Sequence, residues 1–199
     1  MSAQPTSLVA VEEYLAFERH QREKHEFFDG EIYLQAGASM AHNLITANII
    51  GNLHQQLRAS PCNVLPSDMR IRTPRRRQYM YPDATIICGA PIFDDEYHDT
   101  IINPTIIFEV LSPSTEQYDR GRKFQAYRTL PTLQEYLLIS QTMMRVEHFK
   151  RHNDVMWLMI EYSHPDQVIE LASVACTLPL AALYEKVGLV AEEDEPLLE

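Results

Sequence analysis

The sequence predicts an α+β protein with α/β/α-like layers, in which helices flank a mixed, mostly antiparallel central sheet. Two short apolar runs rich in β-branched residues, 79–88 and 104–111, have the composition of buried strands. Helical patterns lie on either side of them in the chain, at 39–59 and 117–130. Four more strand-like runs, separated by turn residues, predict an antiparallel meander at the C-terminal end: 133–140, 144–151, 155–162 and 168–171.

The N-terminal part adds a helix and a hairpin to this layout. Apolar residues at helical spacing predict a helix over residues 8–19. Asp29-Gly30 stands between two strand-like runs and predicts a hairpin over 25–34, because this dipeptide readily forms the tight turn that joins two strands. Ser39 is suited to cap the helix that follows. The remaining predicted elements are strands at 63–65 and 69–72, a surface loop at 89–103 and a short helix at 179–188.

Length and composition indicate one domain with a sizeable core, since the chain has 199 residues and 45% of them are hydrophobic. We expect this domain to cover residues 1–190, and we expect the acidic tail at 191–199 to be disordered. No apolar run approaches the roughly 20 residues of a membrane helix, and residues 1–8 lack the pattern of a secretory signal. These features predict a cytoplasmic protein whose three scattered cysteines are reduced and buried.

Charge is distributed unevenly along the chain. The formal net charge of −11 argues against a generic nucleic-acid binder, although five acids in the tail carry −5 and leave −6 for residues 1–191. A phosphate backbone responds to the local field, so a cluster of arginines can still bind it. The alternative is that this cluster is a solvated hairpin tip. It consists of Arg70, Arg72, Arg75, Arg76 and Arg77.

Two acids in the central strands are the first candidates for chemistry. Asp83 and Glu109 each stand in a run that is otherwise apolar, where a carboxylate without a partner is costly to bury. If the two strands are neighbours, both carboxylates meet at one end of the sheet. Two such carboxylates suit magnesium or manganese, which keep several waters and accept phosphate oxygens from a substrate. Taken singly, each acid also has a structural interpretation, as a turn cap or as the partner of an arginine.

The helix after the second strand carries a third candidate. Asp119, Lys123 and Tyr127 are spaced four apart and therefore share one helix face. From that face Lys123 could orient a metal-bound water or stabilise the charge that builds on a phosphate. A bound metal lowers the pKa of its water from about 15.7 toward about 7, which makes hydroxide available without a nucleophilic side chain. His42, at the start of the helix over 39–59, is either a further site residue or a structural histidine.

The ordered set of these residues resembles the PD-(D/E)XK nuclease superfamily and, within it, the Uma2 (DUF820-like) family of restriction endonucleases. The resemblance extends from about Val11 to Tyr136. It is carried by the hairpin residues Glu26 to Glu31, by His42, by Pro82-Asp83, by the segment Phe108 to Thr115, by Asp119, Lys123 and Tyr127, and by Glu135-Tyr136.

This resemblance implies a restriction-endonuclease-like fold and a Mg²⁺-dependent endonuclease, with Mn²⁺ as a second suitable metal and DNA as the substrate. It implies that Asp83 and Glu109 bind the metal and that both act with Lys123 in catalysis. The accessory residues that it implies are Glu26, His42 and Tyr127. A homodimer is expected, because two sites related by a twofold axis cut both strands of a duplex.

The sequence departs from the superfamily pattern at one position. Leu111 stands two residues after the strand glutamate, where a lysine is expected, and the resemblance implies that Lys123 takes over from the next helix. Together with the negative net charge, this departure keeps a second function open. In it, the protein has a nuclease fold, binds nucleic acid or a protein partner, and does not cut. A third is a metal hydrolase that acts on small phosphoesters.

Overall fold

A six-stranded sheet of order β11-β10-β9-β8-β6-β3 forms the centre of the computed structural model, which describes residues 8–35, 37–75, 78–113 and 115–189. Among these neighbours β8 and β9 pair in parallel and the other pairs are antiparallel. A parallel pair needs a crossover connection, and here the chain passes through a helical segment between the two strands. The strands are β3 (Cys62–Pro66), β6 (Ala84–Cys88), β8 (Ile106–Leu111), β9 (Glu135–Ser140), β10 (Val146–Arg151) and β11 (Trp157–Tyr162).

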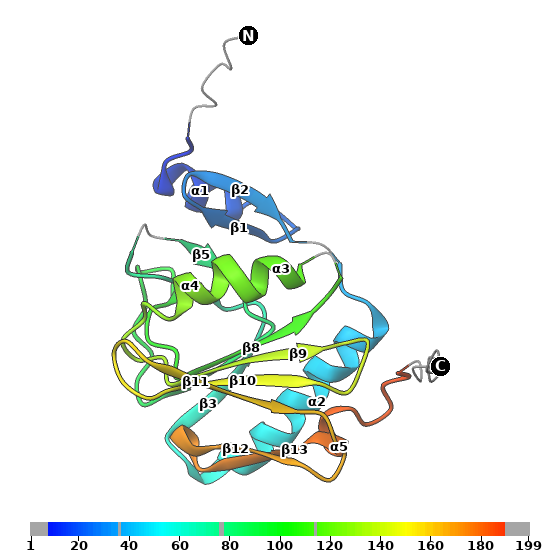
Figure 1. Cartoon of the computed structure of the whole chain (residues 1–199). Coiled ribbons are helices and arrows are strands. Elements are labelled where there is room, and N and C mark those ends of the chain that lie inside the picture. Colours follow the sequence, from blue (N-terminus) through cyan, green and yellow to red (C-terminus); the bar gives the residue numbers. More distant parts are fainter. Residues whose placement is uncertain (1–7, 36, 76–77, 114, 190–199) are drawn as a thin grey trace.

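Helices cover both faces of this sheet (Figure 1), which is why all six residues of β8 are buried. On one face lies α2 (Met40–Gln56), and its cap is the predicted one, because the Ser39 side chain accepts a hydrogen bond from the N–H of His42. On the other face lies a helical segment made of three consecutive pieces: α3 (Glu116–Tyr118), the π-helical turn η2 (Asp119–Lys123) and α4 (Phe124–Tyr127). The predicted α+β class, with a mixed sheet between helices, is confirmed.

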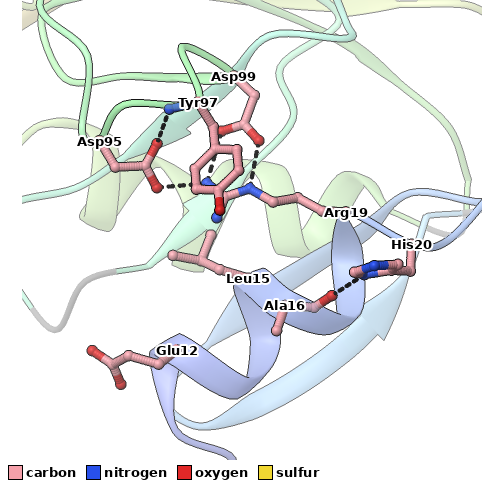
Figure 2. A pocket seen from close by; sticks show the side chains of 8 residues that line it. All are labelled: Glu12, Leu15, Ala16, Arg19, His20, Asp95, Tyr97 and Asp99. Atoms are coloured by element: carbon pink, nitrogen blue, oxygen red, sulfur yellow. Dashed lines mark hydrogen bonds and ion pairs between the residues drawn. The ribbon is translucent and has the colours of Figure 1, made fainter.

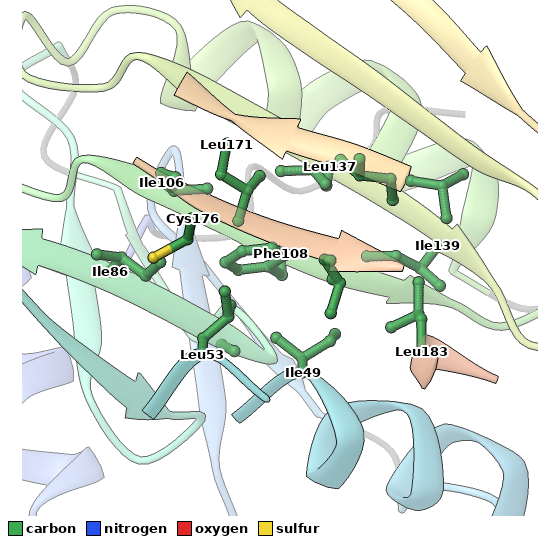
Figure 3. Packing of buried hydrophobic residues seen from close by; sticks show 14 of the residues in the cluster. Ile49, Leu53, Ile86, Ile106, Phe108, Leu137, Ile139, Leu171, Cys176 and Leu183 are labelled. Atoms are coloured by element: carbon green, nitrogen blue, oxygen red, sulfur yellow. The ribbon is translucent and has the colours of Figure 1, made fainter. Parts of the chain in front are cut away.

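One hydrophobic core lies between α2 and the central sheet (Figure 3). Ile49 and Leu53 of α2 and Phe108 of β8 belong to it and are fully buried. Each large apolar side chain buried in this way contributes roughly 1.5–3 kcal/mol of transfer free energy. Three short C-terminal elements add further side chains to the same core: β12 (Val168–Leu171), β13 (Cys176–Pro179) and α5 (Leu180–Leu183).

A second core lies on the opposite face of the sheet, under the helical segment 116–127. Tyr127 and Tyr136 are fully buried there, and the ring of Phe124 stacks on that of Tyr136 with centroids 5.1 Å apart. Since side chains alternate along a strand, Ile107, Glu109 and Leu111 of β8 all point to this face. The polar site described below is therefore enclosed by this core.

A second, five-stranded sheet of order β2-β1-β5-β4-β7 lies beyond the helical segment. Tyr14 of α1 (Val11–Glu18) packs against it, with ring centroids 4.9 Å from Phe27 and 5.5 Å from Tyr79. The predicted N-terminal helix and hairpin are both present, although the helix begins later than expected. The strands are β1 (His25–Phe28), β2 (Glu31–Leu34), β4 (Arg70–Arg72), β5 (Tyr79–Met80) and β7 (Thr100–Ile101).

Three predicted elements need correction. The run 79–88 is two strands in different sheets, β5 and β6, and the chain turns from one sheet to the other around Pro82, which has no N–H to donate to a ladder. The run 168–171 does not extend the meander, because β12 pairs with β13 in a separate two-stranded sheet. The predicted loop 89–103 contains β7, and three of its acids bind arginines instead of facing solvent alone.

The cysteine prediction is wrong for one pair. Cys62 and Cys88 occupy directly opposed positions on β3 and β6 and form a disulfide, whereas Cys176 is free and buried. Their separation of 26 residues gave no sign of this pairing in the sequence. Among the described helices, none is both long and apolar enough to cross a membrane. The acidic tail lies outside the described residues.

Candidate active site

Asp83 and Glu109 lie across from each other at one end of the central sheet. β6 and β8 pair antiparallel with Ala84 opposite Phe108, so the next step of this register brings Asp83 opposite Glu109. Asp83 Oδ2 accepts a hydrogen bond of 2.7 Å from the N–H of Val110. Both carboxylates are buried, with residue exposures of 7% and 3%. The structure thus brings together the two acids that the sequence analysis placed in one site.

His42 reaches the same place from the first turn of α2. Its Nε2 lies 3.1 Å from Asp83 Oδ1, and its side chain remains 16% exposed. Its Nδ1 is buried and has no hydrogen-bond partner among the described residues. His42 therefore holds one oxygen of Asp83, and the partial exposure of this pair marks the side of the site that solvent reaches.

Lys123 lies between three carboxylates. Its Nζ is 3.0 Å from Glu26 Oε1, 3.2 Å from Glu109 Oε1 and 3.2 Å from Asp119 Oδ1. Lys123 is only 5% exposed, so these contacts are shielded from water. The lysine from the helix thus reaches the strand glutamate, as its position on the shared helix face predicts.

A π-helical turn carries this lysine toward the sheet. η2 (Asp119–Lys123) interrupts the α-helical pattern, and such turns are frequent at functional sites. Tyr136 of β9 fixes the start of the turn, since its Oη donates to the carbonyl oxygen of Asp119 at 3.0 Å. One turn after Lys123, Tyr127 Oη donates to Glu109 Oε1 at 3.2 Å. The helix therefore contacts Glu109 through two successive residues of one face.

Glu26 enters the site from a different part of the fold. It lies on β1, in the hairpin of the second sheet, and it is 5% exposed. Its Oε1 accepts a hydrogen bond of 3.2 Å from the N–H of Tyr81, two residues before Asp83. Glu26 is thus bonded both to the segment that carries Asp83 and to Lys123.

The buried charges of this site do not balance. Four carboxylates are buried in the site, those of Glu26, Asp83, Glu109 and Asp119, and the ammonium of Lys123 contacts three of them, whereas Asp83 lies beside His42. Burial raises the pKa of Glu109 well above its usual range, the neighbouring carboxylates raise it further, and the charge of Lys123 offsets only part of this effect. For Lys123, burial lowers the pKa, but the surrounding carboxylates outweigh burial and raise it well above its ordinary value. The ammonium therefore stays charged, whereas burial and the neighbouring carboxylates disfavour the negative charge of Glu109.

Comparison with known proteins places the chain in a family. The model of the Uma2 family, described as "putative restriction endonuclease", matches residues 11–181. The chain belongs to the Uma2 family. Two uncharacterized proteins of Synechocystis are similar to it: one is 36% identical over 180 residues, 90% of this chain and 93% of that protein. The other is 40% identical over 167 residues, 84% of this chain and 94% of that protein.

The fold of this Uma2 chain also has a counterpart among solved structures. A crystal structure described as a putative nuclease belonging to DUF820, from Anabaena variabilis, superimposes with a TM-score of 0.73. The match covers 88% of this chain and 97% of the other at 16% sequence identity. At this identity the likeness shows a common fold, which is the restriction-endonuclease-like fold expected from the sequence.

The donor set of this candidate site fits a magnesium-sized ion better than a metal that needs a complete protein cage. Among the described residues, no three His, Cys, Asp or Glu side chains converge as a ready-made metal site. Mg²⁺ typically binds one or two carboxylates and completes its shell with water and phosphate oxygens. Asp83 and Glu109 match that requirement, and the excess of buried negative charge around Glu109 favours a cation.

The arginine cluster is only partly available to phosphates. Arg70 is 2% exposed and its Nη2 lies 2.6 Å from Asp99, so it does not belong to a surface that binds phosphate. Arg72 pairs with Asp94 at 2.5 Å. Arg75 is exposed, and residues 76–77 lie outside the described part of the chain. Sequence spacing placed all five arginines together, but it could not show which of them the acids of the 89–103 loop hold.

A surface groove lies between α1 and this loop (Figure 2), and Asp83, Glu109 and Lys123 are not among the residues that line it. Arg19 reaches across the groove to Asp95 and Asp99, at 2.5 Å and 2.8 Å. Its guanidinium also lies 3.9 Å from the centre of the Tyr97 ring. These charges are paired within the protein, so we interpret the groove as the junction that attaches α1 to the loop.

Asp119 and Tyr136 are site residues to which the sequence analysis gave no separate role. For Asp119 the available signal was its i, i+4 spacing from Lys123, and Asp119 Oδ1 does contact Lys123 Nζ. For Tyr136 the signal was its place beside Glu135 in the family pattern. Glu135 itself lies on the other face of β9, where its Oε2 is 2.6 Å from His148 Nε2, so its role is structural.

Proposed function

We propose that this Uma2 protein is a magnesium-dependent endonuclease that hydrolyses phosphodiester bonds in DNA. The observation that supports this best is the position of Lys123, buried and within 3.2 Å of Glu109, at the end of the sheet where Asp83 also lies. Two carboxylates for a cation beside one fixed ammonium can together supply an activated water and stabilise the charge that develops on a phosphodiester.

In this proposal each residue has a defined role. Asp83 and Glu109 would hold Mg²⁺, or Mn²⁺ in its place, and the bound ion supplies a water of lowered pKa and neutralises phosphate charge. Lys123 stabilises the negative charge that develops on the phosphate. Tyr127 keeps the Glu109 carboxylate in place through its hydrogen bond, and its own pKa is raised well above the ordinary value, chiefly by burial, so it remains a donor. His42 keeps the Asp83 carboxylate in place through the contact between its Nε2 and Asp83 Oδ1.

Cleavage of supercoiled plasmid in Mg²⁺ or Mn²⁺, together with calorimetric titration of the metal, tests the proposal. Asp83→Asn should abolish metal binding and cleavage. Asp166→Asn, which changes an exposed acid in the turn before β12, should retain both. Equal nicking by the wild type and by Asp83→Asn would contradict the assignment, because the activity would then not come from this site.

A second function has one specific observation in its favour. Lys123 is already surrounded by three carboxylates, and the chain carries a net charge of −11. A protein of this kind could keep the fold, bind nucleic acid or a protein partner, and leave the phosphodiester intact. If the wild type binds DNA fragments but cuts none of them with any divalent metal, this binding function replaces the nuclease.

We further propose that the protein acts as a homodimer that pairs along β11. This strand is an edge of the central sheet, and Leu158, Met159 and Ile160 in it are 49%, 54% and 40% exposed. The strand contains no lysine or proline and one charged residue, Glu161, and a largely apolar edge of this kind is a surface that another strand can extend. Ile160→Lys should reduce the mass measured by light scattering to the 23.0 kDa of one chain, whereas Ile92→Lys, at an exposed loop position, should not. A wild type of monomer mass at micromolar concentration, with and without DNA, would contradict the dimer.

A further inference from the structure

The ammonium of Lys123 is shared by three parts of the fold. Glu109 belongs to the central sheet, Asp119 to the same helical segment as the lysine, and Glu26 to the hairpin of the second sheet. In the proposed site only Glu109 of these three binds the metal. Glu26 and Asp119 therefore compete with a metal ligand for the same ammonium.

Glu26 is held in place independently of Lys123. β1 pairs with β2 on one side and with β5 on the other, and the N–H of Tyr81 donates to Glu26 Oε1. A carboxylate fixed by backbone in this way does not need the lysine to keep its position. It would remain beside the ammonium if Glu109 turned toward another cation. Asp119 lies one helical turn from Lys123 and supports the same position from the helix.

The charges explain why this arrangement matters for a metal. Glu109 Oε1 lies 3.2 Å from Lys123 Nζ, so a divalent cation on Glu109 must share this carboxylate with a positive charge a few ångströms away. Repulsion between cations at such distances is substantial even with the effective dielectric constant of a protein surface. The repulsion is smaller if other carboxylates hold and neutralise the ammonium, and the buried position of all three contacts strengthens that effect.

We infer that Glu26 is a positioning residue that retains Lys123 beside Asp119. Glu109 can then exchange the ammonium for a divalent cation. Glu26 thereby sets the affinity of the site for that cation. The inference rests on the proposed function, because it takes Asp83 and Glu109 as the ligands. It assigns to the N-terminal hairpin a direct influence on metal binding, although the hairpin lies outside the sheet that carries the ligands.

A double-mutant cycle on metal affinity tests this inference. The dissociation constant of Mn²⁺ is measured by calorimetry for the wild type, Glu26→Gln, Lys123→Gln and the double variant. Glu26→Gln should weaken Mn²⁺ binding roughly tenfold, a fraction of the interaction between unit charges near 4 Å. In the Lys123→Gln background the same change should cost less than about threefold, because the ammonium through which it acts is gone. Glu31→Gln removes the same charge from an exposed position of the same hairpin and should change neither value.

Two results would overturn the inference. If Glu26→Gln weakens Mn²⁺ binding equally with and without Lys123, Glu26 is a metal ligand or acts by its charge alone. If it changes nothing in either background, Glu26 has no part in metal binding. Thermal unfolding verifies that each variant folds. If Glu26→Gln does not fold, Glu26→Asp takes its place in the cycle, because it keeps the charge and withdraws it by one methylene. If the wild type binds Mn²⁺ but cuts no DNA, the proposed nuclease function is contradicted and this inference is not. If the wild type binds no Mn²⁺, both are contradicted.

Discussion

Replacing Lys123 with alanine should have two separable effects, one on stability and one on rate. The ammonium lies 3.0, 3.2 and 3.2 Å from buried carboxylates, and removing one partner of a buried ion pair costs about 3–5 kcal/mol. The raised pKa of Glu109 means that this carboxylate readily takes up a proton when the ammonium is removed. We therefore expect a loss near the lower end, about 3 kcal/mol, which lowers the Tm by about 6–12 °C in a domain of this size.

The effect on rate follows from the proposed role of Lys123. Its charge matters most when negative charge develops on the phosphate, so its loss should lower turnover more than it weakens DNA binding. Removal of one preorganised electrostatic donor typically costs 10²–10³ in rate. Single-turnover cleavage of a plasmid in Mg²⁺, at a temperature well below the Tm of the variant, measures this loss without the contribution of unfolding.

The control lies one residue away. Arg122 is exposed, and its guanidinium carbon stacks 4.3 Å from the centre of the Phe28 ring, outside the group of carboxylates around Lys123. Arg122→Ala should therefore lower the Tm and the rate far less than Lys123→Ala. If the two variants cleave alike and near the wild-type rate, Lys123 is a structural lysine and the catalytic reasoning is refuted.

Two further predictions concern the arginine and aspartate pairs of the second sheet. Asp99→Asn removes the carboxylate that binds both Arg19 and the buried guanidinium of Arg70 and should cost about 1–3 kcal/mol, whereas Asp68→Asn breaks only an exposed ion pair with Lys24 and should cost less than about 1 kcal/mol. Burial raises the pKa of Asp99, but the Arg19 hydrogen bond and the charge of Arg70 outweigh burial and lower this pKa from 3.8 to about 2. The stability that Asp99 contributes is therefore present above pH 3.8 and lost as the pH falls toward 2. Urea denaturation of the wild type and of Asp99→Asn across this range should show the difference in their free energies of unfolding shrink as the pH falls. Replacing residues 75–77 by alanine should reduce the slope of log affinity for duplex DNA against log salt by up to about 0.9 for each phosphate that these side chains neutralise, and an unchanged slope would mean that these arginines are only a solvated hairpin.

Local patterns in the sequence were sufficient for most of the fold. The apolar run of β8 predicted a strand buried on both faces, and Ser39 marked the start of α2, because strand burial and helix capping depend on residues close in the chain. Strand partners do not depend on local sequence in this way. The choice of β12 to pair with β13, and the division of 79–88 between two sheets, follow from where the rest of the chain packs.

The same distinction applies to the site. Asp83 and Glu109 could be predicted as a pair because each is an acid in a strand, and two such strands placed side by side bring their ends together. The contact between Glu26 and Lys123 could not be predicted, because it requires the second sheet to lie against the helical segment 116–127. The burial of Arg70 likewise depends on Asp99, an acid 29 residues away that approaches it through the β4–β7 pair.

The charge imbalance itself is an argument that this site has a function. A site with four buried carboxylates and one ammonium, which contacts three of them, does not stabilise a fold, since desolvation of the charges outweighs their attraction unless each charge is matched. Apolar residues of similar volume would extend the surrounding core of Leu111, Tyr127 and Tyr136 and would stabilise the protein more. A divalent cation on Asp83 and Glu109 would remove most of the imbalance, and a phosphate oxygen on that cation would then lie beside the remaining positive charge of Lys123. The arrangement is thus costly for an isolated chain and favourable for a chain that binds a metal and an anionic substrate at the same place.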